Sequence, residues 1–199
     1  MDTYQIISSH FQGAMETIAM SVDDLAGGID AAAGAMADCL LGDGKIMACG
    51  NGTDGALAQL FVGNLLSRYE NERPALPALC LAADTTSIAA IARNSGVNDI
   101  YARQLRALGN EGDLLLCLNS GRGGSSLVRA IQAAHERNVG VVLLSNSADE
   151  ALGPLAAQGD IELRIESAQA SRVVELHLMI LHCFCHLIDN SLFGAYEQD

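Results

Sequence analysis

Two loops rich in small polar residues stand out in this sequence: "GNGTDG" at 50–55 and "NSGRGGSS" at 119–126. Each follows an apolar run and precedes a stretch compatible with a helix. Strand, glycine turn and helix in that order favour an anion cradle, because free backbone N–H groups and the positive end of the helix face the ligand. The alternative is that both loops are ordinary tight turns.

The donors of these loops are the candidate binding residues: Asn51, Gly52, Thr53, Ser120, Arg122 and Ser125. Asp54 in the first loop opposes such binding. Repulsion between two unit charges about 4 Å apart costs on the order of 1–4 kcal/mol near a surface. We therefore expect weak affinity for a phosphate, and we expect Asp54→Ser to increase it.

The elements that position these loops follow from the apolar pattern. Strands are predicted at 45–50, 76–82, 113–119, 139–145 and 160–165. The first four are almost continuously apolar, as in parallel strands that are covered on both faces, whereas the fifth alternates and is expected at an edge. Crossover helices are predicted near 54–70, 84–108, 123–137 and 148–157. The sequence thus predicts an α/β fold with a doubly wound, five-stranded parallel sheet, a three-layer arrangement of the flavodoxin or Rossmann type.

The chain of 199 residues is expected to form one domain, 1–199. Two helices, near 3–25 and 28–42, would make an N-terminal oligomerisation segment over 1–42, and 43–199 would hold the α/β core and a final helix at 169–190. Apolar residues cover most of that helix, which indicates neighbours on several sides and an oligomer.

Composition excludes several classes of protein. The net charge is −13 and no basic stripe is present, which argues against direct nucleic-acid binding. No apolar run reaches the roughly 18 residues of a membrane span, and the N-terminus does not read as a signal peptide. The six cysteines form no C-x-x-C motif and are expected to be buried, reduced thiols in a cytoplasmic protein.

Four stretches carry a resemblance to a known family: "CGNG" at 49–52, "RYENERPALPA" at 68–78, "IYARQLRALGNEGDLLL" at 100–116 and "ELHLMILHCFCHLIDNSLFG" at 175–194. They are similar to the SIS (sugar isomerase) domain family, in the branch of the phosphoheptose isomerases and the initiator-associating protein DiaA. The resemblance covers nearly the whole chain. It implies a homotetramer with phosphosugar sites between subunits and, in the catalytic branch, zinc-aided isomerisation of sedoheptulose 7-phosphate.

The catalytic positions that the resemblance implies are mostly replaced. A metal-binding His and an acid/base Glu of the family correspond here to Leu60 and Asn64, and a Gln and a His of the final helix correspond to Val174 and His182. Leucine offers no lone pair to a metal, and asparagine exchanges no proton near neutral pH. The resemblance therefore implies no bound zinc and no assigned catalytic residue, with His182 the surviving family position.

The second loop has also changed. The family motif Ser-Thr-Ser-Gly-Asn-Ser corresponds here to 119–124, where only Ser120 keeps its hydroxyl, while Arg122 adds a cationic donor. We predict a non-catalytic binding or regulatory protein of the DiaA type, with DnaA as a protein partner in replication initiation. The alternatives are an active phosphoheptose isomerase that converts sedoheptulose 7-phosphate to D-glycero-D-manno-heptose 7-phosphate, and a phosphosugar sensor without turnover.

Two further groups of residues have two interpretations each. Leu192, Phe193 and Tyr196 near the acidic C-terminus either dock onto the fold or form a partner-binding patch. Arg68 and Arg73 flank the turn at 68–74. They are expected to form ion pairs that support the fold, rather than to contact a sugar.

Overall fold

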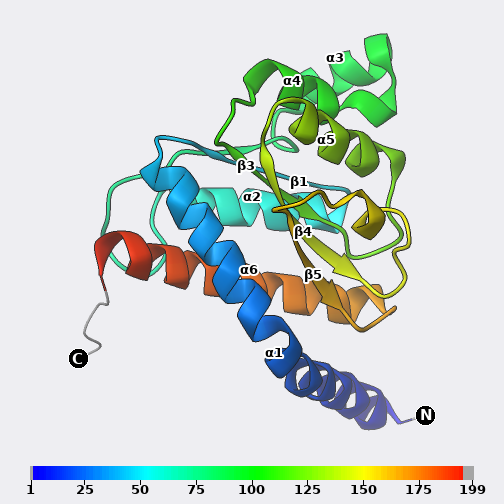
Figure 1. The fold of residues 1–199 in the computed structure, drawn as a ribbon. Coiled ribbons are helices and arrows are strands. Elements are labelled where there is room, and N and C mark those ends of the chain that lie inside the picture. The colour runs from blue at the N-terminus through cyan, green and yellow to red at the C-terminus, as the bar shows by residue number, and fades with distance from the viewer. Residues whose placement is uncertain (1, 195–199) are drawn as a thin grey trace.

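A wholly parallel sheet of five strands forms the centre of the molecule, with helices on both faces (Figure 1). The structure is a computed structural model that describes residues 2–194. The strand order is β2-β1-β3-β4-β5. The strands are β1 (Ile46–Gly50), β2 (Ala78–Cys80), β3 (Leu114–Leu118), β4 (Gly140–Asn146) and β5 (Ile161–Ile165). The predicted α/β class, the parallel sheet and the edge position of the fifth strand are confirmed.

The middle of the sheet explains the continuous apolar runs. Every residue of β1 and β3 is buried, because helices cover both faces there. In the register of this pair, Gly50 lies beside Leu118. The two loops of interest therefore leave neighbouring strands side by side, at the edge of the sheet where ligands bind in open α/β folds.

Three helices cover one face: α1 (Thr3–Leu41), α2 (Thr53–Leu66) and α6 (Ala170–Phe193). α6 contacts both α1 and α2, which accounts for its apolar circumference. At its centre, Phe184 meets Phe61 of α2 edge to face, with ring centroids 6.4 Å apart. α6 is long and apolar enough to cross a membrane, but half of its most apolar window is buried inside the fold. It is the core helix of a folded domain, and it does not indicate a membrane protein.

The other face carries α3 (Thr85–Ser95), α4 (Ala102–Leu108) and α5 (Ser125–Glu136), with 3₁₀ turns η1 (Val97–Asp99) and η2 (Gly153–Leu155). The single helix predicted at 84–108 is wrong, because Gly96 with φ +98° ends α3. The helix predicted at 148–157 is also wrong. Asp149 accepts hydrogen bonds from the backbone of Ala151 and Leu152, and such local bonding competes with helix formation.

The N-terminal segment is one helix of 39 residues, and the predicted break near residue 26 is absent from α1. Gly28 lies within this helix and packs against β5. A side chain at Gly28 would collide with Leu163, so glycine permits the close approach of helix and sheet. Gly27 faces open space, so the only cost of a glycine at this position is its low helix propensity.

The first half of α1 projects beyond the rest of the molecule (Figure 1). Large apolar side chains are exposed along it, including Phe11 at 70 % and Met20 at 78 %. A row of exposed apolar groups on a soluble domain marks an interaction surface. This placement is consistent with the assignment of 1–42 to oligomerisation, which remains a prediction.

Candidate functional site

The first loop is a tight turn between β1 and α2. Gly52 has φ +57°, a conformation that glycine adopts at no steric cost, and α2 begins at Thr53. Gly50 lies against α2 so closely that a Cβ there would stand 2.6 Å from the Cβ of Asp54. The positive end of α2 is thereby brought directly onto the end of the strand.

Asp54 points into the protein rather than toward a ligand. It is 4 % exposed, and its Oδ2 accepts hydrogen bonds from the backbone N–H of Ser120 at 2.8 Å and from its hydroxyl at 3.0 Å. Its Oδ1 lies 3.6 Å from Nδ1 of His177 in α6. The carboxylate is turned inward and joins the two loops, so it does not face the cradle. The expected weak affinity for a phosphate remains a prediction.

The second loop is held by buried amides and a carboxylate. The side-chain amide of Asn119 donates to Oδ2 of Asp149 at 2.9 Å and to the carbonyl of Gly121 at 3.1 Å. Asn146 donates to the carbonyls of Asn119 and Gly121, at 2.9 and 2.7 Å. Since Asn119, Asn146 and Asp149 are all buried, these bonds hold the start of the loop in one conformation.

Two further contacts join the loops to each other and to the layer behind them. Asn51 and the hydroxyl of Ser126, at the start of α5, exchange hydrogen bonds of 3.1 and 3.2 Å. The hydroxyl of Tyr101 donates to the carbonyl of Gly50 at 2.7 Å. Burial raises the pKa of Tyr101, so this phenol stays protonated as a donor. The N-termini of α2 and α5 are thus fixed next to each other.

The predicted binding residues divide into two groups. Asn51, Gly52, Thr53, Arg122 and Ser125 are exposed at this edge of the sheet. Ser120 is buried, and its hydroxyl proton is directed to Asp54. Ser120 is therefore a support of the loop rather than a free donor. Arg122 also borders a shallow hollow of about 370 Å³, formed with the segment 148–151.

His182 lies on α6, in a hollow between α1 and α6. It is half-buried, and its ring stacks on Tyr69 with centroids 5.6 Å apart. The hollow measures about 560 Å³ and is lined largely by apolar side chains. Burial raises the pKa of the Tyr69 phenol, which keeps its proton available for donation.

The residues at the family's catalytic positions do not form a metal site. Leu60 is exposed, Val174 packs against the core, and the side-chain amide of Asn64 lies 3.9 Å from Sγ of Cys185. Within residues 2–194, no group of three or more His, Cys, Asp or Glu side chains is placed to hold an ion. Of the side chains at these positions, Leu60 and Val174 offer no lone pair to a metal.

The cysteines are free thiols: Cys39, Cys49, Cys80, Cys117, Cys183 and Cys185. Five are buried, as expected, and Cys183 is half-buried. Burial raises the pKa of Cys39 to about 11 and that of Cys185 to about 12, so both remain protonated near neutral pH.

The C-terminal patch is only partly described. Leu192, in the last turn of α6, packs against the core, which supports docking onto the fold, while Phe193 is 39 % exposed. Tyr196 lies outside the described residues. The assignment of Leu192 and Phe193 to partner binding remains a prediction.

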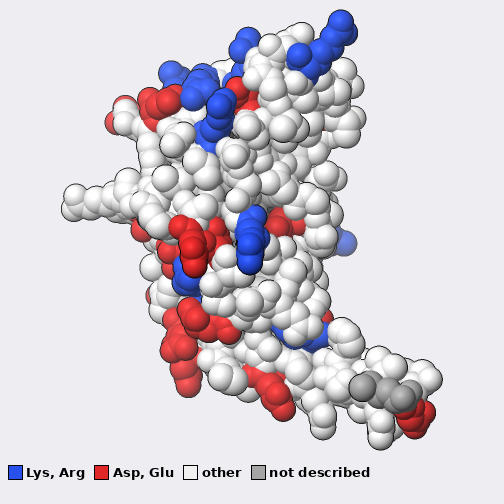
Figure 2. All heavy atoms as spheres, turned by 90° about the vertical axis from the view of Figure 1, so that its right-hand side faces the viewer, with Lys and Arg blue, Asp and Glu red and all other residues white. Residues whose placement is uncertain are grey.

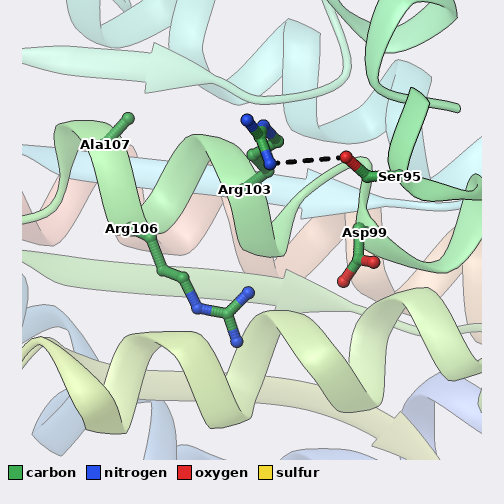
Figure 3. A pocket seen from close by; sticks show the side chains of 5 residues that line it. All are labelled: Ser95, Asp99, Arg103, Arg106 and Ala107. Carbon is green, nitrogen blue, oxygen red and sulfur yellow. Dashed lines mark hydrogen bonds between the residues drawn. The ribbon is translucent and has the colours of Figure 1, made fainter.

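A separate hollow of about 390 Å³ lies on the outer layer and is lined by Ser95, Asp99, Arg103, Arg106 and Ala107 (Figure 3). Asp99 accepts from Arg129 at 2.8 Å, and Arg106 pairs with Glu136 at 2.7 Å. Figure 2 shows basic side chains gathered at the upper end of the molecule and acidic side chains in scattered groups on that face. Because Arg106 and Asp99 of the lining already form ion pairs, with Glu136 and Arg129, we interpret this hollow as part of a surface ion-pair network.

Comparison with known proteins places the chain among close relatives. The SIS domain matches residues 10–146. The chain is 40% identical over 197 residues to a phosphoheptose isomerase of Chromohalobacter salexigens, with 99% of this chain and 100% of that one covered. It is 38% identical to one of Methylococcus capsulatus, with 98% and 100% covered.

Solved structures agree with these sequence relatives. The structure of a phosphoheptose isomerase from Francisella tularensis matches with a TM-score of 0.92 at 36% identity, over 96% of this chain and 100% of that one. One from Neisseria gonorrhoeae matches with a TM-score of 0.90 at 28% identity, over 95% and 100%.

These relatives overturn the predicted function. Curated proteins that match this chain from end to end are named phosphoheptose isomerase, which favours the isomerase alternative over a regulator that has lost catalysis. The prediction of a non-catalytic, DiaA-like protein is therefore wrong. The DnaA partnership that it implied has no support in the comparisons.

Proposed function

Because the chain belongs to the SIS domain family, we propose that it is a phosphosugar isomerase of the phosphoheptose isomerase type. Its reaction would interconvert sedoheptulose 7-phosphate and D-glycero-D-manno-heptose 7-phosphate. The observation that carries the proposal is the end-to-end likeness to chains of that name, at 40% and 38% identity. The rigid pair of loops at the ligand-binding edge of the sheet supports it.

In this proposal the phosphate lies between the N-termini of α2 and α5. Thr53 and Ser125 begin these helices, and both are exposed. Free N–H groups and the helix dipoles favour a dianion at this place. Arg122 adds a cationic donor at the rim, and the inward carboxylate of Asp54 leaves the cradle open to negative charge.

Isomerisation moves a proton between adjacent carbons, which requires a base and a donor for the carbonyl oxygen. Leu60 and Asn64 supply neither a base nor a metal ligand, so we assign the proton transfer to the imidazole of His182. His182 lies five positions beyond His177 on α6, an axial rise of about 7.5 Å and a rotation of about 140°. It therefore faces the hollow between α1 and α6 rather than Asp54. The phenol of Tyr69 beside it is the proposed donor to the carbonyl oxygen.

We propose that the reaction proceeds without zinc. The support is that the family's ligand positions hold Leu60, Asn64 and Val174, and that the described part of the chain gathers no three-residue metal cluster.

A homotetramer in the cytoplasm is part of the proposal. The exposed apolar side chains of the first half of α1 offer a surface that a second copy would cover. The free thiols suit a reducing compartment.

The test is a turnover assay with sedoheptulose 7-phosphate, followed by NMR of the two sugars. The wild type should convert it, and His182→Asn should lower kcat by at least about 100-fold, the usual contribution of a general base. His135→Asn is the control, because His135 pairs with Asp160 on the far side of the sheet. Absence of turnover in the wild type would refute the activity, and an active His182→Asn would refute its assignment.

A further inference from the structure

Asp54 makes the only contact within residues 2–194 in which a charged group of the first loop binds the second loop directly. Its Oδ2 receives both the N–H and the hydroxyl of Ser120. Hydrogen bonds to a charged acceptor are about twice as strong as those between neutral groups. The two bonds therefore fix Ser120, which immediately precedes the glycine-rich stretch 121–124.

The other oxygen of Asp54 faces a buried histidine. His177 is fully buried, and its Nδ1 lies 3.6 Å from Oδ1 of Asp54. Within the described residues, Oδ1 and both ring nitrogens lack a hydrogen-bond partner. Buried polar atoms without partners are rare, and each calls for an explanation such as a functional role.

We propose that Asp54 and His177 are positioning residues for the phosphate cradle: the imidazole holds the carboxylate, and the carboxylate holds the second loop at Ser120. Neither side chain touches the substrate. This inference rests on the proposed function only in naming a sugar phosphate as the ligand of the cradle.

The composition of the second loop explains why such an anchor would affect affinity. Three of its four residues from 121 to 124 are glycines, which lose the most conformational freedom when a ligand orders them. A loop that is ordered before binding avoids that cost. Its anchors to Asn146 and Asp149 hold the side that faces β4. On the side of α2, Asp54 holds the start of the loop at Ser120, and Asn51 holds its end at Ser126.

The first test is hydrogen exchange of the backbone amides, which does not depend on turnover. In Asp54→Ala the amide of Ser120 should exchange at least about tenfold faster, while the amides of β3 keep their rates. Asp54→Asn should restore much of the protection, because its amide oxygen can still accept from Ser120. His177→Leu, which removes the imidazole that lies 3.6 Å from Oδ1 of Asp54, should also speed exchange.

The second test is kinetics with sedoheptulose 7-phosphate. Asp54→Ala should raise KM about tenfold, while kcat changes by less than about threefold, because the anchor acts on binding and not on the proton transfer. If the wild type shows no turnover, the proposed function fails. Calorimetric titration with inorganic phosphate, together with the exchange data, still tests the anchor.

The matched control is Asp113→Asn, which alters a buried carboxylate at the opposite end of the sheet. Asp113 binds the backbone N–H groups of Lys45 and Asn110 at 2.9 and 2.8 Å. The Asp113→Asn variant should lower the free energy of unfolding without changing the exchange rate of the Ser120 amide or the affinity for phosphate. Wild-type exchange at Ser120 in Asp54→Ala, or equal effects of Asp113→Asn on the loop, would overturn the proposal. If Asp54→Ala does not fold, His177→Leu carries the comparison with the wild type.

Discussion

Arg73 joins the end of α2 to the end of α6, and its replacement should unfold this corner of the molecule. Its Nε donates to Oδ1 of Asp189 at 2.6 Å. Its two terminal nitrogens donate to the carbonyls of Leu65 and Asn64, at 2.9 and 2.8 Å. Those carbonyls belong to the last turn of α2, where helical partners are missing. The arginine side chain is 0% exposed and that of Asp189 is 5% exposed.

The expected cost of Arg73→Leu follows from this burial. Removing one partner of a buried ion pair costs about 3–5 kcal/mol, because the remaining charge is left uncompensated. That is a large share of the roughly 5–15 kcal/mol that stabilises a domain. For a chain of this length, about 2–4 °C of Tm is lost per kcal/mol, so the Tm should fall by about 6–20 °C.

Arg68→Leu is the matched control, because Arg68 flanks the same turn and also pairs with a carboxylate. Arg68 and its partner Glu72 are 52% and 84% exposed, and exposed pairs contribute at most about 1 kcal/mol. Thermal unfolding followed by circular dichroism compares the two variants directly. Equal shifts in Tm would refute the reasoning that burial decides the effect.

Dialysis against EDTA should leave turnover unchanged, since Leu60 and Val174 at the family's ligand positions offer no lone pair to zinc; activity that is lost and then restored by zinc would contradict this. Phe11→Glu should lower the mass measured by light scattering, because Phe11 is 70 % exposed on α1; an unchanged mass would place the interface elsewhere. Gly27→Ala should stabilise α1 by about 1 kcal/mol through helix propensity. Gly28→Ala should be less stable than Gly27→Ala by about 1–3 kcal/mol in urea unfolding, because its side chain would collide with Leu163; equal stabilities would argue against the close contact with β5.

The sequence predicted most of the sheet because buried parallel strands are continuously apolar. All five strands lie within two residues of their predicted bounds. The same pattern failed where local chemistry decides the conformation. Asp149 binds the backbone of the segment after β4, and Gly96 ends α3, so helical composition did not produce helix there. The single long α1 was not predicted, because two shorter helices were expected over the same residues.

The site was predicted less well than the fold. The two loops were identified by their glycines, but the direction of the Asp54 side chain depends on Ser120 and His177, which lie 66 and 123 positions further along the chain. The sequence features that could have indicated this contact were a carboxylate in a glycine turn and a histidine on an apolar helix. The replacements at Leu60 and Asn64 led to a prediction of lost activity, which the relatives of full length overturn.

The central claim is that this chain isomerises a phosphosugar by proton transfer, and NMR of the reaction in D₂O tests it most directly. With sedoheptulose 7-phosphate and micromolar protein, after treatment with EDTA, the account predicts appearance of the aldose. It also predicts solvent deuterium at the carbon that receives the proton, because a base that exchanges with solvent carries it. If neither the aldose nor deuterium exchange into the ketose is observed after prolonged incubation, the account is contradicted.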